Sequence, residues 1–298
     1  MRVGVIGSTN VDYVLSVERF VEEGETLKVR SFEKFPGGKG ANQAVSAAKL
    51  GAEVVFVTAV GDDEDGKWMI ERFKGFGIAG PLVVDSPTGK AFIEVDSKGR
   101  NRILIFCGAN DLLTPSRVDF SILEDVEMVL LQNEIPFETT FKAAKWAKEK
   151  GKIVVFDPAP VEGIEREILE YVDYLTPNEV EIEGISRKFF GDFKGVEWAA
   201  EKLMELGAGA VVAKLGERGI YFKKGLKEVM IDAPRVEAVD TTAAGDVFNG
   251  AFAAFFERGE LEALRLAVKA ASISVTRKGA QSSIPSIEEV MGGERGSG

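Results

Sequence analysis

The stretch VDTTAAGDVFNGA, residues 239–251, determines how the rest of the chain is interpreted. Small residues lead into the carboxylate of Asp246, and a helical pattern follows from about 248 to 257. A loop that feeds a helix N-terminus directs several unpaired backbone N–H groups at one spot, where the helix dipole favours an anion. Residues 243–245 carry almost no side chain, so a ligand can approach the backbone closely.

Asp246 at the mouth of this loop has two interpretations. A carboxylate beside an anion hole suits a general base, which takes a proton from a hydroxyl while the N–H groups stabilise a transferring phosphoryl group. Aspartate is also a favoured N-cap residue, so Asp246 taken alone is equally consistent with simple helix capping. The remaining sequence has to separate the two.

Composition restricts the protein class. The 298 residues are 45% apolar and 29% charged, which is typical of a globular protein, and a net charge of −11 argues against a nucleic-acid partner. The chain contains no histidine, which excludes Ser-His, Cys-His and His-zinc chemistry. Its apolar runs are only strand-sized, which predicts no membrane span. Cys107 is the single cysteine, so no intramolecular disulfide can form, and a reducing, cytoplasmic location is expected.

Strand and helix patterns alternate along most of the chain, among them a strand at 54–60, a helix at about 64–75 and a hairpin at 220–231. This alternation predicts a doubly wound, mostly parallel α/β sheet with helices on both faces. We expect one domain, 1–291, followed by a disordered tail, 292–298. Two strand-only segments, about 13–35 and 91–106, predict a small β-sheet lid over an active site.

Polar clusters follow the expected strands, and the carboxyl ends of parallel strands share one sheet edge. Convergence at that edge is not expected of a simple helix cap. The clusters are Asn10 and Asp12, the glycine-rich segment 36–44, Glu134, Asp157 with Asn178, the loop 216–219, and 240–246.

Two further glycine-containing segments resemble ligand-binding motifs. Segment 36–44, PGGKGANQA, precedes a helix that ends near Leu50, and its Lys39 and Asn42 favour a ligand site over a plain glycine turn. Segment 61–68, GDDEDGKW, superficially resembles a P-loop. We reject this motif because Trp68 stands where Ser or Thr is needed and the acidic residues would repel phosphate.

With the segments GGKGANQA (37–44) and DTTAAGDVFNGA (240–251), the chain resembles the ribokinase family of carbohydrate kinases over nearly its whole length. Ala243 stands where the family more often has Gly. Segments 7–12 (GSTNVD), 176–179 (TPNE) and 276–281 (TRKGAQ) resemble the ribokinase branch of the family. The resemblance implies ATP-dependent phosphorylation of the primary O5 hydroxyl of ribose.

The resemblance also implies roles for individual residues. Asp246 would be the catalytic base, with an anion hole formed by Ala243, Ala244, Gly245 and Asp246. Sugar hydroxyls would be bound by Asn10, Asp12, Gly38, Lys39, Asn42 and Glu134. The nucleotide would be bound by Asn178, Lys214, Leu215, Gly216, Glu217, Gly219, Ala244, Gly245 and Val268. Glu181 would hold Mg²⁺ through water, and K⁺ would lie near Asp240, Thr242, Ser274, Arg277, Gly279 and Ser283.

Three alternatives remain open at this point. A related kinase of the family would act on ribose 1-phosphate, a nucleoside, fructose or inositol, and Arg30, Arg100 and Arg102 on or near the lid would suit a phosphorylated substrate. Lys214, where many ribokinases carry Thr, leaves ADP open as the donor. A non-catalytic sugar or nucleotide sensor is the alternative of another class. The partners expected are a small sugar and a nucleotide, without nucleic acid or membrane, and a homodimer formed through the lid.

Overall fold

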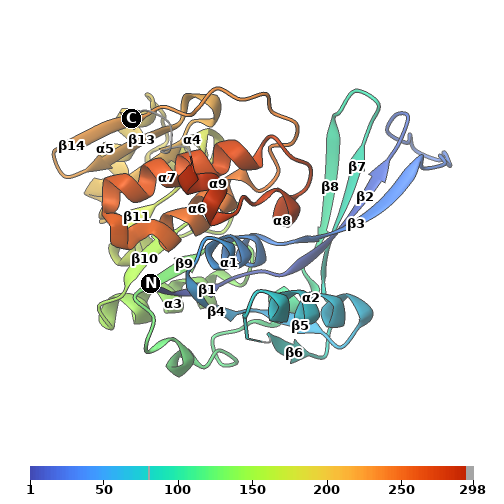
Figure 1. Ribbon diagram of the computed structural model, residues 1–298, viewed down its shortest axis with the longest axis horizontal. Helices are drawn as coiled ribbons and strands as arrows, with labels where there is room; N and C mark the ends of the chain where they lie inside the picture. The colour runs from blue at the N-terminus through green and yellow to red at the C-terminus, as the bar shows by residue number, and fades with distance from the viewer. Residues whose placement is uncertain (80, 293–298) are drawn as a thin grey trace.

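The computed structural model describes residues 1–79 and 81–292. Its centre is an eight-stranded sheet (Figure 1). The strands are β1 (Arg2–Ile6), β4 (Glu53–Val57), β9 (Met128–Leu131), β10 (Ile153–Phe156), β11 (Tyr174–Leu175), β12 (Val211–Lys214), β13 (Ile220–Lys224) and β14 (Lys227–Ile231). Their order is β14-β13-β12-β11-β10-β9-β1-β4, and neighbouring strands pair in parallel except on the two sides of β13, where the pairing is antiparallel. The predicted mostly parallel sheet is confirmed.

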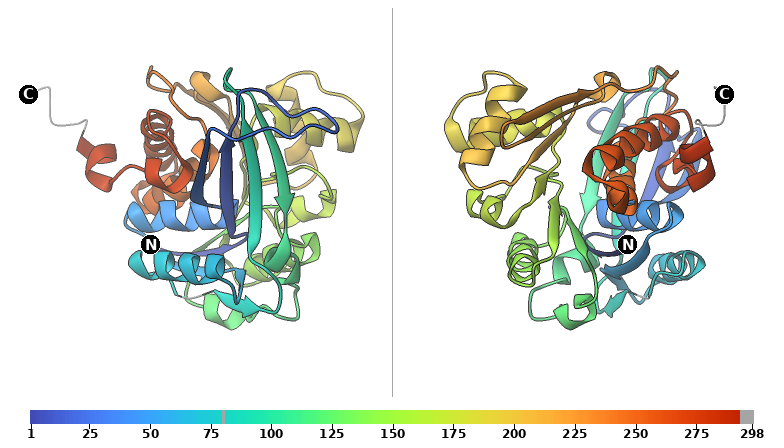
Figure 2. Two further views of the ribbon diagram at one scale, coloured as in Figure 1. Left: turned by 90° about the vertical axis from the view of Figure 1, so that its right-hand side faces the viewer. Right: turned by 60° about the vertical axis from the view of Figure 1, so that its left-hand side comes forward.

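Helices cover both faces of this sheet (Figure 2). One buried cluster contains residues of α1 (Lys39–Lys49), α2 (Glu64–Gly75), α6 (Ala244–Phe255) and α7 (Glu260–Ser274). The other contains residues of α3 (Phe137–Glu149), α4 (Glu179–Phe190) and α5 (Val196–Glu205). Alternate strand residues point to opposite faces, so Val5 joins the first cluster and Ile6 the second. Short helices α8 (Ala280–Ser283) and α9 (Ile287–Met291) follow α7.

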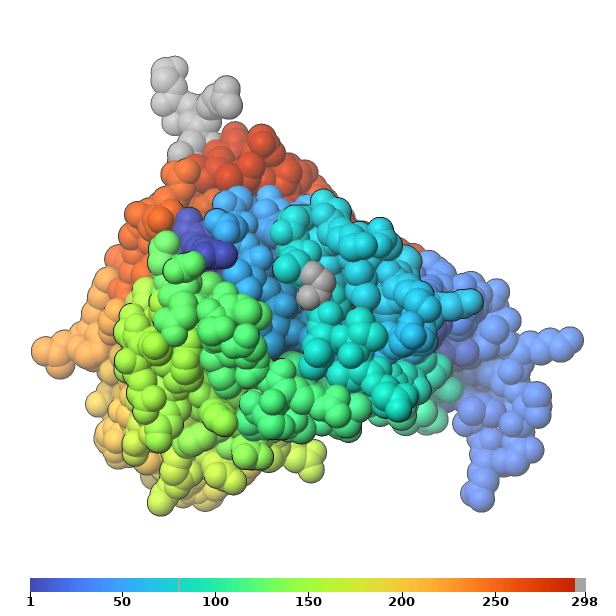
Figure 3. Space-filling model, turned by 90° about the horizontal axis from the view of Figure 1, so that it is seen from below, coloured from blue at the N-terminus to red at the C-terminus, as the bar shows by residue number. Residues whose placement is uncertain are grey.

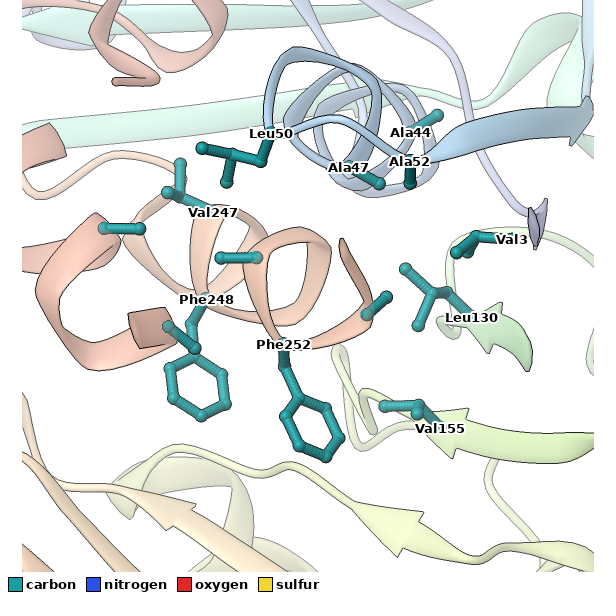
Figure 4. Close-up of a cluster of buried hydrophobic side chains, with 14 of the residues drawn as sticks. Val3, Ala44, Ala47, Leu50, Ala52, Leu130, Val155, Val247, Phe248 and Phe252 are labelled. Atoms are coloured by element: carbon teal, nitrogen blue, oxygen red, sulfur yellow. The ribbon is translucent and has the colours of Figure 1, made fainter. Parts of the chain in front are cut away.

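Helix α6 is packed on the central sheet and α1 (Figure 4). The side chains of Phe248 and Phe252 are buried, and Leu130 and Val155 from the sheet belong to the same cluster. A Cβ on Gly250 would lie 2.7 Å from the carbonyl oxygen of Gln43, so the glycine allows α1 and α6 to approach closely. This contact fixes the α6 N-terminus relative to the α1 N-terminus.

A separate four-stranded sheet, the lid, stands beside the body (Figures 1 and 3). Its strands are β2 (Asn10–Ser16), β3 (Ser31–Gly37), β7 (Gly89–Val95) and β8 (Asn101–Phe106), in the order β3-β2-β7-β8. They begin before the predicted segments 13–35 and 91–106, so Asn10 and Asp12 belong to a lid strand and not to a loop after β1. The Tyr13 hydroxyl donates to Asp65 of α2 at 2.8 Å and thereby ties the lid to the body.

Several predicted boundaries were wrong. The strand expected at 54–60 ends at Val57, because β5 (Ala59–Gly61) pairs with β6 (Leu82–Val84) in a second small sheet. Helix α6 begins at Ala244, four residues before the expected 248. The predicted tail lies, apart from Gly292, outside the described residues. Across those residues, we find no helix long and apolar enough to cross a membrane.

Candidate active site

The order in which strands are added to the sheet reverses between β1 and β9. From β1 the chain builds outward to β4 on one side, and β9 to β14 follow on the other. Ligands of doubly wound sheets bind beyond the carboxyl ends of the strands at such a point. Here Ser8, after β1, donates its hydroxyl to Glu134, after β9, at 2.6 Å. The predicted convergence of strand-end residues is present.

The N-terminus of α1 lies against this point because two glycines permit it. Gly38 has φ of 88°, and a Cβ there would lie 2.7 Å from the Asn10 nitrogen. A Cβ on Gly40 would lie 2.6 Å from the Gly7 carbonyl carbon. The Lys39 N–H consequently reaches Glu134 and donates to its carboxylate at 3.1 Å.

Asp12, Glu134 and Asp246 form a group of neighbouring carboxylates. Burial, then the charges of Glu134 and Asp246, raise the pKa of Asp12 to about 7. Burial disfavours the charged form of Lys39 and so acts to lower its pKa. Four nearby carboxylates outweigh this effect and hold the pKa of Lys39 above its ordinary value: Asp246, Asp157, Glu134 and Glu181. The half-buried Lys39 side chain therefore supplies the positive charge that compensates these acids.

Asn10 is oriented by a residue that the sequence interpretation missed. Asn110, in the 3₁₀ turn η1 (Gly108–Leu112), donates to the Asn10 side-chain oxygen at 2.8 Å and to the Thr9 carbonyl at 3.1 Å. Its own oxygen accepts the Thr9 N–H at 2.9 Å. Nothing in its local sequence distinguished this buried asparagine, because only the fold brings 110 beside 9 and 10.

Asp246 does not cap α6. The N-cap is Ala243, whose φ of 60° is left-handed, and Asp246 lies in the first helical turn. Its carboxylate accepts one hydrogen bond from Asn42 and one from Gln43, each at 3.1 Å. The side chain is 3% exposed. Burial and the neighbouring Asp157 raise its pKa to about 6, against the lowering effects of Lys39 and the two amides.

A lysine faces the turn before Asp246. The Lys214 ammonium donates to Asp157 at 3.0 Å and lies 3.1 Å from the position that a Cβ on Gly245 would occupy. A side chain at Gly245 would require the Lys214 side chain to shift by a few tenths of an ångström. The α6 N-terminus, which follows the small residues 243–245, and the Lys214 ammonium therefore place positive charge next to the buried carboxylate of Asp246.

A cleft of about 420 Å³ lies between β14 and α7. Val268 is among its lining residues, as are Ile231 and Asp232, while Gly219 packs against the same β14 end. Leu215 is buried and Gly216 has φ of 59°. Glu217 is exposed. Of the predicted nucleotide residues, Val268 therefore lines this cleft and Gly219 lies beside it.

Asn178 and Glu181 form a capping box at the start of α4. Asn178 accepts the Glu181 N–H at 2.9 Å, and Glu181 accepts the Asn178 N–H at 2.7 Å. Burial and Asp157 raise the pKa of Glu181. Within residues 1–79 and 81–292, no group of three or more acidic or cysteine side chains could hold a metal ion.

The residues predicted around K⁺ are brought together by two loops. Asp240 accepts the Thr242 N–H at 2.9 Å and the Gly279 N–H at 2.8 Å. The hydroxyls of Ser274 and Ser283 donate to carbonyls of their own helices, and the Arg277 side chain pairs with Glu289. Asp240 therefore joins the loop before α6 to the segment before α8.

Two buried residues of the site, Gln43 and Asp157, were given no individual role from the sequence, although Asp157 was among the strand-end residues expected to converge. The Gln43 amide donates to both Asp157 and Asp246 at 3.1 Å. Gln43 stands next to Asn42 in the glycine-rich motif, and Asp157 follows a strand like the other site residues. Their positions, in a glycine-rich motif and directly after a strand, are the sequence features that pointed to the site.

Several known proteins are similar to this chain over nearly its whole length. The family described as "pfkB family carbohydrate kinase" matches residues 2–287. A ribokinase of Haemophilus influenzae is 40% identical, covering 96% of each chain. The crystal structure of a ribokinase of Thermotoga maritima superposes with a TM-score of 0.95 at 51% identity, covering 98% of each chain. That of Arabidopsis thaliana ribokinase complexed with ribose and ATP gives 0.90 at 35% identity, covering 99% of each.

Proposed function

The chain belongs to the pfkB family of carbohydrate kinases, and from this premise we propose that it transfers the γ-phosphoryl group of ATP to the primary O5 hydroxyl of ribose. It is a phosphotransferase with an alcohol group as acceptor. Asp246 is the general base in this proposal, and the backbone of residues 243–246 is the anion hole. The proposal also assigns the reaction to the cytoplasm, where ATP is supplied.

The buried carboxylate of Asp246 at the α6 N-terminus is the observation that carries the proposal. Two amides hold it, and its pKa of about 6 lets it accept a proton near neutral pH. Backbone N–H groups at the same helix end stabilise charge on the phosphoryl oxygens. Phosphoryl transfer needs such positioning and charge stabilisation more than covalent chemistry.

The sugar binds, in this proposal, between the lid and the α1 N-terminus. Asn10, Asp12, Gly38, Lys39, Asn42 and Glu134 would hold its hydroxyls. Asn42 already donates to Asp246, so a hydroxyl bound by Asn42 would lie beside the base. Closure of the lid would exclude water from this space.

The nucleotide occupies the path from residues 243–245 to the cleft between β14 and α7. Its phosphates lie at the α6 N-terminus near Lys214, and its base lies in the cleft near Val268. Asn178, Leu215, Gly216, Glu217 and Gly219 border this path in the proposal. When bound, Mg²⁺ neutralises phosphate charge, and Glu181 fits as a carboxylate that holds it through water.

Two finer features complete the proposal. A monovalent cation, K⁺, is held by the loops that Asp240 joins, near Thr242, Ser274, Arg277, Gly279 and Ser283. Activity in K⁺ compared with tetramethylammonium at equal ionic strength tests this site. A homodimer forms through the lid, where Phe32, Leu104 and Ile105 are more than half exposed. Leu104→Glu should produce monomers in sedimentation analysis.

A phosphorylated acceptor is less well supported than ribose. Arg30 pairs with Glu18, Arg100 pairs with Asp96 at 2.6 Å, and the Arg102 guanidinium lies 4.2 Å from the Phe20 ring centroid. These three cations are engaged within the lid and its connections, so they offer no prepared phosphate site. Ribose 1-phosphate would have to displace these contacts.

An acceptor and donor panel tests the proposal. We would measure transfer from ATP and from ADP to ribose, 2-deoxyribose, ribose 1-phosphate, fructose, inositol and nucleosides, with Mg²⁺ and K⁺. The highest kcat/KM is expected for ribose with ATP. Preference for another acceptor, or for ADP, would replace this assignment within the family. Binding without any turnover would identify a sensor.

A further inference from the structure

Gln43 lies between two buried carboxylates, those of Asp246 and Asp157. It follows Asn42 in the first turn of α1 and is 1% exposed. Its Nε2 donates to Asp246 Oδ1 and to Asp157 Oδ2, each at 3.1 Å. An amide nitrogen carries two hydrogens, so this group serves one carboxylate with each. No other described side chain joins Asp246 to Asp157 in this way.

Gln132 determines which way the Gln43 amide faces. Its Nε2 donates to Gln43 Oε1 at 2.7 Å. A flipped Gln43 would direct its carbonyl oxygen at two carboxylates and its nitrogen at the Gln132 nitrogen, which is unfavourable at all three contacts. The observed orientation is therefore the one that satisfies the network.

Gln132 holds this position although its own oxygen, Oε1, is buried without a hydrogen-bond partner among the described residues. A buried unpaired acceptor destabilises a fold, so a contact that requires one calls for an explanation. Gln132 follows β9 directly, whereas Gln43 belongs to α1 on one face of the sheet. The contact between them extends the network from the base to the central sheet.

Resting on the function proposed above, we propose that Gln43 is the positioning residue of the general base. Its amide orients the Asp246 carboxylate and bridges it to Asp157, and Gln132 locks the amide in that orientation. Gln43 acts through Asp246 and need not contact the sugar or the nucleotide. Asn42 supplies the second hydrogen bond to Asp246, so the carboxylate is fixed at both oxygens.

The charged groups around Asp246 determine what loss of Gln43 would do. Lys39 faces it from α1, Asp157 from the end of β10, and Asp12 from the lid strand β2. Lys214 faces the adjacent Gly245. Without the amide, Asp246 loses a hydrogen bond that favours its charged form while the repulsion from Asp157 remains. Its proton affinity would then rise, and its orientation toward the acceptor hydroxyl would be lost.

The test compares Gln43→Leu, Gln132→Leu and their double variant with Ser46→Ala. Ser46, one turn further along α1, donates to the Val247 carbonyl at 3.2 Å, so its loss removes a buried α1–α6 hydrogen bond without touching Asp246. The first readout is the pKa of Asp246, measured by carbon NMR in aspartate-labelled protein without ligands and assigned with Asp246→Asn.

We expect Gln43→Leu to raise the pKa of Asp246 by about one pH unit, the effect of one charge-assisted hydrogen bond. Gln132→Leu should raise it by less, and Ser46→Ala should leave it unchanged. In the double variant, Gln132→Leu should add nothing, because it acts only through Gln43. An unchanged Asp246 pKa in folded Gln43→Leu protein, or full additivity of the two leucine variants, would overturn the proposal.

Turnover supplies the second readout. With ribose and ATP, kcat of Gln43→Leu at pH 7 should fall by about tenfold to a hundredfold while the KM for ribose changes by less than about threefold. The acid limb of kcat should move upward with the Asp246 pKa. Failure of the parent enzyme to use ribose would refute the assigned function, whereas the NMR titration would still decide the role of Gln43. A raised KM with unchanged kcat would make Gln43 a sugar-binding residue and refute the positioning role.

Discussion

Asp246→Asn should abolish most activity, and its unfolding free energy should lack the decrease with rising pH that ionisation of Asp246 causes in the parent. The carboxyl has a pKa of about 6 in the folded protein against an ordinary 3.8, chiefly because of burial. A raised carboxyl pKa means that stability falls as pH rises from the unfolded pKa through the folded one. Asparagine carries no charge and does not titrate, so the variant should lack this loss.

The magnitude follows from the two pKa values. Between about pH 4 and pH 7, linkage predicts that the parent loses about 2 kcal/mol of unfolding free energy through Asp246. In the variant, the side-chain NH₂ group faces an N–H donor of Asn42 or Gln43. This donor–donor contact should lower the unfolding free energy by about 1–3 kcal/mol at every pH. The two effects nearly cancel at neutral pH. The change with pH therefore tests the reasoning better than stability at one pH.

Chemical denaturation of parent and Asp246→Asn at about pH 4, 5.5 and 7 is the assay. The difference in unfolding free energy should move in favour of the variant by about 2 kcal/mol across this range. Asp63→Asn is the control. Burial disfavours the charge of Asp63, but hydrogen bonds from Thr88 and Gly66 lower its pKa overall below the ordinary 3.8, so the stability difference between this control and the parent should change little between about pH 4 and pH 7. A pH-independent difference for Asp246→Asn would refute the linkage argument.

Three further predictions concern catalysis, packing and the lid. The kcat for the sugar should fall about tenfold per pH unit below about pH 6, because only deprotonated Asp246 accepts a proton, and a flat profile down to pH 5 would contradict the base assignment. Gly250→Ala should destabilise the protein by about 1–3 kcal/mol in denaturant titration, since the new Cβ would overlap the Ser46 side chain; an unchanged midpoint would show that α1 and α6 can separate freely. Asp65→Ala should raise the KM for the sugar several-fold and increase proteolysis of the lid, because Asp65 binds the Tyr13 hydroxyl and pairs with Lys34 at 2.6 Å. An unchanged KM and an unchanged rate of proteolysis would mean that other contacts hold the lid.

The sequence predicted the parts of the fold that depend on local patterns. Apolar strand segments alternating with helical ones predicted the parallel sheet, and helix 64–75 has the expected bounds. Turn residues placed the β13–β14 hairpin. These features follow from side-chain periodicity and turn chemistry, which depend on residues close together in the sequence. The strand at 54–60 was predicted as continuous because periodicity does not report which sheet accepts a strand.

The sequence by itself also determined the chemical inventory of the protein: no histidine, a carboxylate beside small residues at a helix start, and two motifs typical of one family. Tertiary structure alone decided which groups the carboxylate contacts. It excluded helix capping by directing Asp246 at Asn42 and Gln43, which are about two hundred residues away along the chain. The pKa of Asp246 likewise depends on burial and on Asp157, because solvation and Coulomb interactions depend on distances in space and not along the sequence.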